Sequence, residues 1–129
     1  DDTYNANPDS VRAAIDVLAD LPGPRLLVLG DMGEVGQQGP QFHAEAGRYA
    51  KAKGVTFLAG VGELAQVAVE AFEGAVHSLN MDQLIDTVLG HMPRVRSVLV
   101  KGSRFMRMER VVDALMPYAV KNQERRRAP

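Results

Sequence analysis

The strongest constraint on this sequence is a repeated alternation between short apolar runs and segments whose apolar residues recur at helical spacing. The run at 25–29 is continuous, which is typical of a strand that is buried on both faces of a sheet, and further strands are expected over 55–59, 76–79 and 97–100. Segments with apolar residues three and four positions apart separate these runs. Strands joined by helices pair in parallel through right-handed crossovers. The alternation therefore predicts an α/β fold, a doubly wound, mostly parallel sheet with helices on both faces.

Local signals indicate where the helices begin and end. Pro8 suits the first turn of a helix, and the sequence Leu-Pro-Gly-Pro at 21–24 ends that helix. A second helix is expected from about Pro40 to Lys53. The short sequence Gly-Val-Gly at 60–62 is expected to form a turn, and Asn80 to cap the helix that follows the third strand.

Length and composition indicate a single ordered domain. The chain has 129 residues and a mass of 14.0 kDa, of which 46% are hydrophobic and 24% are charged, values that exclude disorder as a description of the whole chain. We expect one domain over 1–121 and a flexible tail over 122–129, which is polar and lacks periodicity. The arginines at 125–127 are expected to be solvated there.

Charge and residue usage exclude several classes of function. The formal net charge is −1, which gives no general attraction to nucleic acid or to an anionic membrane. Cysteine is absent, which excludes disulfides, thiolate metal sites and cysteine nucleophiles. No apolar run is long enough to span a bilayer, and no signal-peptide pattern is present. We expect a cytoplasmic protein. Because the sequence opens on Asp1 and not on methionine, we also expect a segment of a longer polypeptide.

Three polar loops are expected to meet at one edge of the sheet. Ligands of open parallel sheets bind beyond the carboxyl ends of the strands. The opening segment 1–7, the glycine-rich loop 30–36 and the loop 101–104 all lie at such ends in the predicted topology. This edge is therefore where we expect the chemistry of the domain.

The opening segment has the side chains of a nucleoside contact. Asp2 can accept hydrogen bonds from ribose hydroxyls, while Tyr4, Asn5 and Asn7 supply an aromatic face and two amides. The alternative is that these residues only start the helix at Pro8. On composition alone, the helix-starting interpretation is the favoured one.

The other two loops have opposite charges. The loop 30–36 lacks both the G-x-G-x-x-G order and the G-K-[ST] ending of phosphate loops, and its acids Asp31 and Glu34 would repel a phosphate and suit an ammonium group. Lys101, Ser103 and Arg104 could hold a carboxylate or a phosphate. The loop 30–36 could equally be an ordinary solvated turn, and for 101–104 taken alone a solvated turn is the favoured alternative.

The histidines do not indicate a metal site. Their scattered positions lack the spacing of metal ligands, so a zinc site has no support. His43 lies early in a helix beside the glycine-rich loop, where it could face the ligand edge; a structural role is the favoured alternative.

Taken together, the motifs DDTYNANP at 1–8, LGDMGEVG at 29–36 and VKGSR at 100–104 resemble the C-terminal domain of the Mur ligases. The resemblance covers nearly the whole chain, with the motifs in the same order and at similar spacing. It is greatest to the members that add D-alanyl-D-alanine. The D-N-P-R signature of the members that add meso-diaminopimelate is absent from this sequence.

The resemblance implies a Rossmann-like third domain of an enzyme of peptidoglycan biosynthesis. The partner would be a central P-loop ATPase domain of the same polypeptide, and the cofactors ATP and Mg²⁺. The enzyme would phosphorylate the terminal carboxylate of UDP-N-acetylmuramoyl-tripeptide, and the amine of D-alanyl-D-alanine would attack the acyl phosphate. Because this chain has no G-K-[ST] loop, we expect it to be inactive alone and to bind no cofactor by itself.

The resemblance also assigns roles to residues of this chain, none of them catalytic and none a metal ligand. On the nucleotide side it implies ATP contacts by Asp2, Tyr4, Asn5 and Asn7. On the side of the incoming dipeptide it implies contacts by Asp31, Met32, Glu34, Lys101, Ser103 and Arg104.

An α/β module unrelated to ligation is the alternative function. A receiver-like or nucleotide-binding domain would show an acidic cluster and a later lysine, which Asp1, Asp2 and Lys101 match loosely. A receiver would also need a phosphoacceptor aspartate at the end of a strand. Asp31 is the candidate after the strand 25–29, and it follows a glycine.

Overall fold

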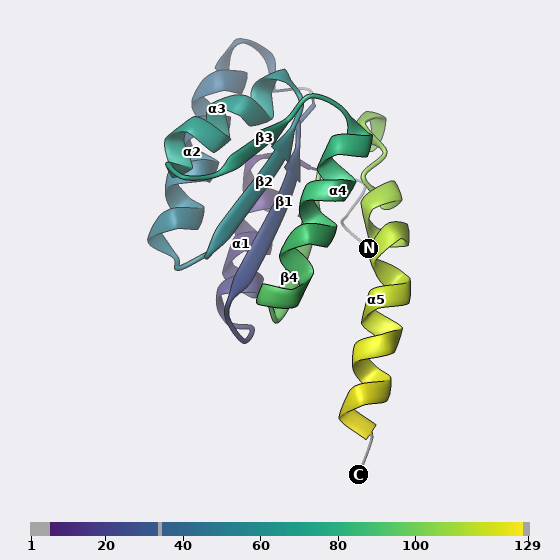
Figure 1. The fold of residues 1–129 in the computed structure, drawn as a ribbon. Helices are drawn as coiled ribbons and strands as arrows, with labels where there is room; N and C mark the ends of the chain where they lie inside the picture. The colour runs from purple at the N-terminus through teal and green to yellow at the C-terminus, as the bar shows by residue number, and fades with distance from the viewer. Residues whose placement is uncertain (1–5, 34, 128–129) are drawn as a thin grey trace.

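The computed structural model describes residues 6–33 and 35–127. Helices and strands alternate along the chain (Figure 1). In order they are α1 (Pro8–Ala19), β1 (Arg25–Gly30), a 3-10 turn (Gly36–Gln38), α2 (Gly39–Ala52), β2 (Phe57–Val61), α3 (Glu63–Phe72), β3 (Val76–Ser78), α4 (Met81–His91), a 3-10 turn (Met92–Arg94), β4 (Ser97–Lys101), a 3-10 turn (Arg104–Met106) and α5 (Glu109–Arg127).

The four strands form one parallel sheet in the order β3-β2-β1-β4. Val28 of β1 lies opposite Ala59 of β2 on one side and Val100 of β4 on the other. The chain moves outward from β1 to β2 and β3, and then returns to place β4 on the other side of β1. The predicted doubly wound α/β fold is confirmed.

The two faces of the sheet are covered by different helices (Figure 1). Leu27 and Leu29 of β1 pack into a core with residues of α1, α2 and α3. Their neighbours Leu26 and Val28 point to the other face, into a core with α4 and α5. All four leucine and valine side chains are at most 1% exposed, which explains why the run is continuously apolar.

The second strand begins and ends later than the sequence predicts. We expected a strand over 55–59 and a turn over 60–62, whereas β2 spans Phe57–Val61. Val55 instead closes the end of α2, since its N–H donates to the carbonyl of Ala50 at 3.0 Å. Gly60 stays in the strand because α3 packs directly on it: a Cβ at this position would lie 2.9 Å from Cγ2 of Val69.

The last helix extends beyond its predicted end. Over 122–127 the structure continues α5, where the sequence predicts a polar tail without regular structure. Figure 1 shows the C-terminal half of α5 projecting past the sheet. The flexibility of this segment stays a prediction. Among the helices of the described residues, none combines the length and apolar character needed to cross a membrane.

Candidate functional site

The carboxyl ends of β1 and β4 form the topological switch point of the sheet. They are neighbours, since Leu29 lies opposite Lys101. From β1 the chain continues to α2 on one face of the sheet, and from β4 it continues to α5 on the other face. Diverging connections of this kind leave room for a ligand in doubly wound folds.

Ser103 joins the three loops that the sequence places at this edge. Its N–H donates to the carbonyl of Asp31 at 3.0 Å. Its hydroxyl donates to the carbonyl of Ala6 at 3.3 Å and accepts the N–H of Gly33. The predicted convergence is therefore confirmed for Ala6, for 30–33 and for 101–104.

Glycines allow the loops after β1 and β4 to pack against each other. A Cβ on Gly102 would lie 2.5 Å from Cγ of Met108 and 3.4 Å from Cα of Gly30. A Cβ on Gly33 would lie 2.8 Å from Cε1 of Phe105. The distances of 2.5 and 2.8 Å are shorter than real Cβ contacts, so only glycine lets each loop pack this closely against its neighbours in the domain.

Asp31 holds the start of α3. Its Oδ1 accepts the N–H of Ala65 at 2.7 Å, in the first turn of that helix, where a carboxylate also interacts favourably with the helix dipole. Gly62, directly before the helix, has a φ of 110°. A Cβ there would lie 2.3 Å from Oδ1 of Asp31, so the carboxylate fills the space that a side chain would need.

Met32 and His43 link the glycine-rich loop to α2. The side chain of Met32 is 1% exposed and that of His43 is fully buried. The N–H of Met32 donates to Nε2 of His43 at 3.0 Å, and Nδ1 of His43 lies 2.6 Å from the carbonyl of Gly39. An acceptor at Nε2 and a carbonyl beside Nδ1 define the neutral tautomer with its proton on Nδ1.

Burial is the main influence on the pKa of His43. It lowers the pKa from the usual 6.5, while the hydrogen bond to Gly39 and the charge of Asp31 act in the opposite direction. The structural role that the sequence favoured for this histidine is confirmed. The only sequence signal for it is its position beside the glycine-rich loop.

The loop after β4 presents both buried and exposed side chains. Lys101 is 2% exposed and Ser103 is 7% exposed, so both belong mainly to the interior. Arg104 is exposed. Phe105 follows it in the same 3-10 turn with 65% of its surface exposed, although it contacts the loop at Gly33. Sequence reasoning missed Phe105, whose signal is an aromatic residue directly after a polar motif.

Of the predicted nucleotide contacts, only Asn7 is described; Asp2, Tyr4 and Asn5 lie outside the described residues, as does Glu34 on the dipeptide side. The side chain of Asn7 accepts the N–H of Ser10 at 2.9 Å, and the hydroxyl of Ser10 accepts the N–H of Asn7 at 2.9 Å. This is a capping box at the start of α1. Asn7 therefore has the helix-starting role that the sequence favours. Contact of the opening segment with ATP stays a prediction.

Fold and site together define a doubly wound α/β domain in which three loops gather at the carboxyl ends of β1 and β4. The model of the family described as "Mur ligase, glutamate ligase domain" matches residues 2–104. The chain belongs to this family.

Individual relatives carry the name of one ligase. UDP-N-acetylmuramoyl-tripeptide–D-alanyl-D-alanine ligase of Escherichia coli (strain K12) is 41% identical over 89% of this chain, and that of Bacillus subtilis (strain 168) is 32% identical over 89%. The matched parts are 26% and 27% of the relatives. The chain therefore spans about a quarter of the length of these curated relatives.

Solved structures agree with this match. A crystal structure of MurF from Acinetobacter baumannii superposes with a TM-score of 0.81 at 36% identity, covering 91% of this chain and 27% of that one. MurF ligase from Thermotoga maritima in complex with ADP superposes with a TM-score of 0.75 at 26% identity, covering 95% of this chain and 28% of that one. The match favours the ligase-domain interpretation over a receiver-like module.

Proposed function

We propose that this chain is the C-terminal domain of the ATP-dependent ligase that adds D-alanyl-D-alanine to UDP-N-acetylmuramoyl-tripeptide. The relatives of the chain carry this name, and the loops that the resemblance assigns to ligands lie at the ligand edge of the fold. The reaction makes a peptidoglycan precursor, and because its ATP and UDP-linked substrate belong to the cytoplasm, we also propose a cytoplasmic location.

The observation that carries this proposal is the junction at Ser103. One hydroxyl and one N–H tie Ala6, the glycine-rich loop and the loop after β4 into a single unit. Ala6, which directly precedes the proposed nucleotide contact Asn7, and the proposed dipeptide side are thereby fixed relative to each other. A domain that presents one substrate beside another needs such a fixed geometry, because misplacement by about 1 Å costs much of the rate.

On the dipeptide side, the structure favours different tasks for the assigned residues. Arg104 is exposed at the rim and offers a guanidinium that can hold the carboxylate of D-alanyl-D-alanine through two hydrogen bonds. Met32, Lys101 and Ser103 are buried, and Asp31 binds the start of α3. We assign these four the task of placing Arg104 and the loop backbone, while Glu34 stays a proposed contact of the dipeptide ammonium.

The nucleotide side rests on the opening segment. Asp2, Tyr4, Asn5 and Asn7 are proposed to border ATP, which supplies the phosphoryl group that activates the tripeptide carboxylate. The chain has no G-K-[ST] loop, and no three potential ligands among His, Asp and Glu of the described residues group together as a metal site would require. We therefore assign the phosphate loop and the Mg²⁺ ligands to a central domain of the same polypeptide.

A titration of the isotope-labelled chain followed by NMR tests the proposal. D-alanyl-D-alanine is expected to shift the signals of 30–33 and 101–105, whereas ATP is expected to shift none in this chain alone, because the phosphate loop is assigned to the central domain. L-alanyl-L-alanine is the matched control ligand, since it has the same charges and composition and the opposite chirality. Arg104→Gln is expected to weaken dipeptide binding about tenfold or more, because it removes a charge-assisted hydrogen bond.

Arg107→Gln is the control variant, since Arg107 is an exposed arginine three positions further along the same loop. It should bind the dipeptide as the unaltered chain does. Signals that shift equally with both dipeptides, or equal losses in the two variants, would contradict the proposed dipeptide site. Ligase turnover by this chain alone would contradict the assignment of the ATPase machinery to another domain.

A further inference from the structure

His43 and Ser103 accept hydrogen bonds from two consecutive N–H groups of the glycine-rich loop. Nε2 of His43 accepts the N–H of Met32 at 3.0 Å, and the hydroxyl of Ser103 accepts the N–H of Gly33. His43 belongs to α2 and Ser103 to the loop after β4. The loop backbone is therefore clamped between a helix on one face of the sheet and the segment that carries Arg104.

We propose that His43 is a positioning residue of the dipeptide site: the acceptor at its Nε2 holds the glycine-rich loop in the conformation in which Ser103 can join it, and thereby sets the position of Arg104. This inference rests on the proposed function for its consequence in ligation. Its structural part, that the Nε2 acceptor fixes the loop, stands on the hydrogen bonds alone.

The imidazole is well suited to this role because its two nitrogens have different tasks. Nδ1–H is bound by the carbonyl of Gly39 at the start of α2, at 2.6 Å, so Nε2 is left with its lone pair facing the loop. The side chain has no exposed surface, so water cannot replace either partner. A proton added at Nε2 would face the N–H of Met32, donor against donor, and would release the loop.

The charge environment of His43 comes from the loop that it holds. Asp31, one residue before Met32, is the charged group that acts on the imidazole, and it favours protonation. Burial acts more strongly and keeps the ring neutral. The carboxylate of Asp31 also accepts the N–H of Ala65, so it interacts with the start of α3 as well as with His43. The hydrogen bond from Met32 to Nε2 of His43 is therefore present when the ring is neutral and is lost when acid protonates the ring.

The first test needs no variant. In the ¹⁵N spectrum of the labelled chain at neutral pH, Nε2 of His43 should show the chemical shift of an unprotonated nitrogen, and Nδ1 that of a protonated one. The opposite tautomer would overturn the proposal, because Nε2 could then not accept from Met32.

The second test compares substitutions that keep or remove the acceptor. His43→Gln can place an amide oxygen near the Nε2 position, whereas His43→Met has a similar length and no comparable acceptor. His43→Asn reaches the Nδ1 position and can keep the bond to Gly39 without reaching Met32. Hydrogen exchange of the Met32 amide should be about tenfold faster in the Met and Asn variants than in the Gln variant, the scale of one lost hydrogen bond.

Equal exchange in the three variants would overturn the positioning role, since loss of packing alone would then account for their behaviour. If His43→Met does not fold, the comparison of His43→Gln with His43→Asn and the tautomer measurement still decide whether the Nε2 acceptor holds the loop.

The third test measures ligation by the full-length enzyme that carries this chain. His43→Asn should raise the KM for D-alanyl-D-alanine roughly three- to tenfold with little change in kcat, and His43→Gln should restore most of the affinity. An unchanged KM in His43→Asn, together with faster exchange at Met32, would overturn the link from the loop to the dipeptide. Absence of ligation by the unaltered enzyme would refute the proposed function and leave the two NMR tests valid.

Discussion

Side chains tie the loops together differently at the two ends of the parallel strands. We call the end where the strands begin the amino edge and the end where they finish the carboxyl edge. At the amino edge, Arg25 ties loops together by donating to the carbonyls of Leu21 at 2.8 Å and Gly54 at 3.2 Å, and the hydroxyl of Ser97 donates to that of Pro22 at 2.7 Å. These bonds are open to solvent. At the carboxyl edge, the side chains that tie the loops, His43 and Ser103, are buried.

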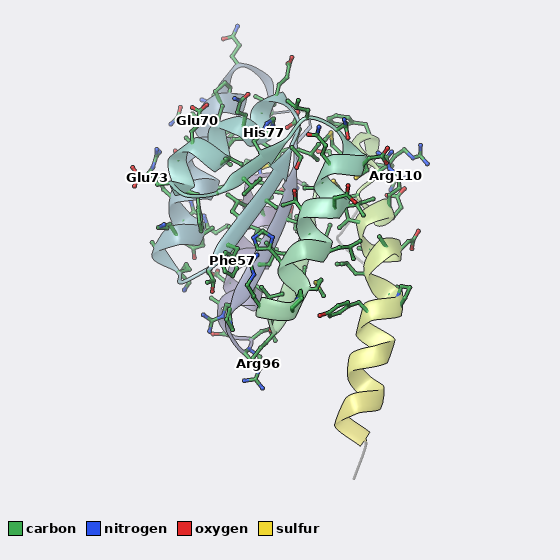
Figure 2. All side chains as sticks on the ribbon, viewed as in Figure 1. Phe57, Glu70, Glu73, His77, Arg96 and Arg110 are labelled. Atoms are coloured by element: carbon green, nitrogen blue, oxygen red, sulfur yellow. The ribbon has the colours of Figure 1, made fainter. Side chains whose placement is uncertain are left out.

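Figure 2 labels residues near both ends of the strands. Phe57 and Arg96 lie at the amino edge, and His77 lies toward the other end of the sheet. Phe57 contacts the ring of His91 and the guanidinium of Arg94, with centroid distances of 4.9 and 5.7 Å. His77 instead binds a main-chain carbonyl, that of Gly62, at 2.8 Å, next to the turn that Asp31 fills.

The difference indicates which edge has a fixed conformation. An exposed hydrogen bond exchanges readily with water, so its loss costs little. A buried polar group that loses its partner pays the full cost of desolvation. The carboxyl edge is thus committed to one arrangement of its loops, and a binding site held in advance loses less entropy when a ligand arrives. The amino edge, whose bonds are exposed, is expected to tolerate change more readily.

Replacement of a glycine by alanine should give the largest difference between the two edges in the loss of unfolding free energy. Gly62→Ala at the carboxyl edge combines a φ of 110° with a Cβ placed 2.3 Å from Oδ1 of Asp31; it should lower the free energy of unfolding by about 3 kcal/mol. Gly54→Ala at the amino edge has a φ of 88° and its nearest neighbour at 3.6 Å; it should cost about 1 kcal/mol. Urea unfolding measures both, and equal losses would remove the contrast.

Removal of one hydroxyl at each edge gives the next largest difference. Ser103→Ala leaves the N–H of Gly33 and the carbonyl of Ala6 without their partner and should cost about 2 kcal/mol. Ser97→Ala removes an exposed bond to Pro22 and should cost about 0.5 kcal/mol. Thermal or urea unfolding measures the pair. A larger loss in Ser97→Ala would show that the carboxyl edge is not the more constrained one.

The sequence predicts the carboxyl edge in outline because the topology of a doubly wound sheet follows from a simple pattern. The apolar run 25–29 is continuous since both of its faces are buried, and this alone identifies a central strand. Once the strands are parallel, the loops after β1 and β4 must lie at one end. The placement of these two loops at one end of the sheet is therefore a consequence of periodicity and not of any single residue.

The tasks of the site residues are not predictable in the same way. Asp31 binds the N–H of Ala65, and Ser103 the carbonyl of Ala6, across long stretches of chain; such contacts depend on side-chain directions that periodicity does not fix. A lysine in a loop motif would be expected at the surface, yet Lys101 is 2% exposed at the end of β4, where it lies opposite Leu29 of β1. A sequence motif indicates which residues lie close together in the fold, and side-chain packing decides which of them can face a ligand.

The pH dependence of stability should reveal the buried histidine of the carboxyl edge. Burial lowers the folded-state pKa of His43 below the 6.5 of the unfolded chain. Its contribution is therefore complete above pH 6.5 and is lost as the pH falls below that value, because the unfolded chain then binds a proton that the folded chain does not. Unfolding free energies of the unaltered chain and of His43→Gln, measured on both sides of this pH, should diverge in acid; parallel curves would contradict a buried neutral imidazole.

The smallest effect is expected at an exposed ion pair outside the carboxyl edge. Lys53, directly after α2, lies 3.6 Å from Asp16 of α1, and the two side chains are 42% and 48% exposed. Lys53→Ala should cost less than about 0.5 kcal/mol, since solvent screens such a pair, and Asp16 keeps the hydroxyl of Tyr49 as a partner at 2.5 Å. Dipeptide binding should be unchanged. Urea unfolding at low and high salt checks both the size and its electrostatic origin; a loss approaching that of Ser103→Ala would mean that exposed contacts fix this fold as firmly as the buried ones at the carboxyl edge.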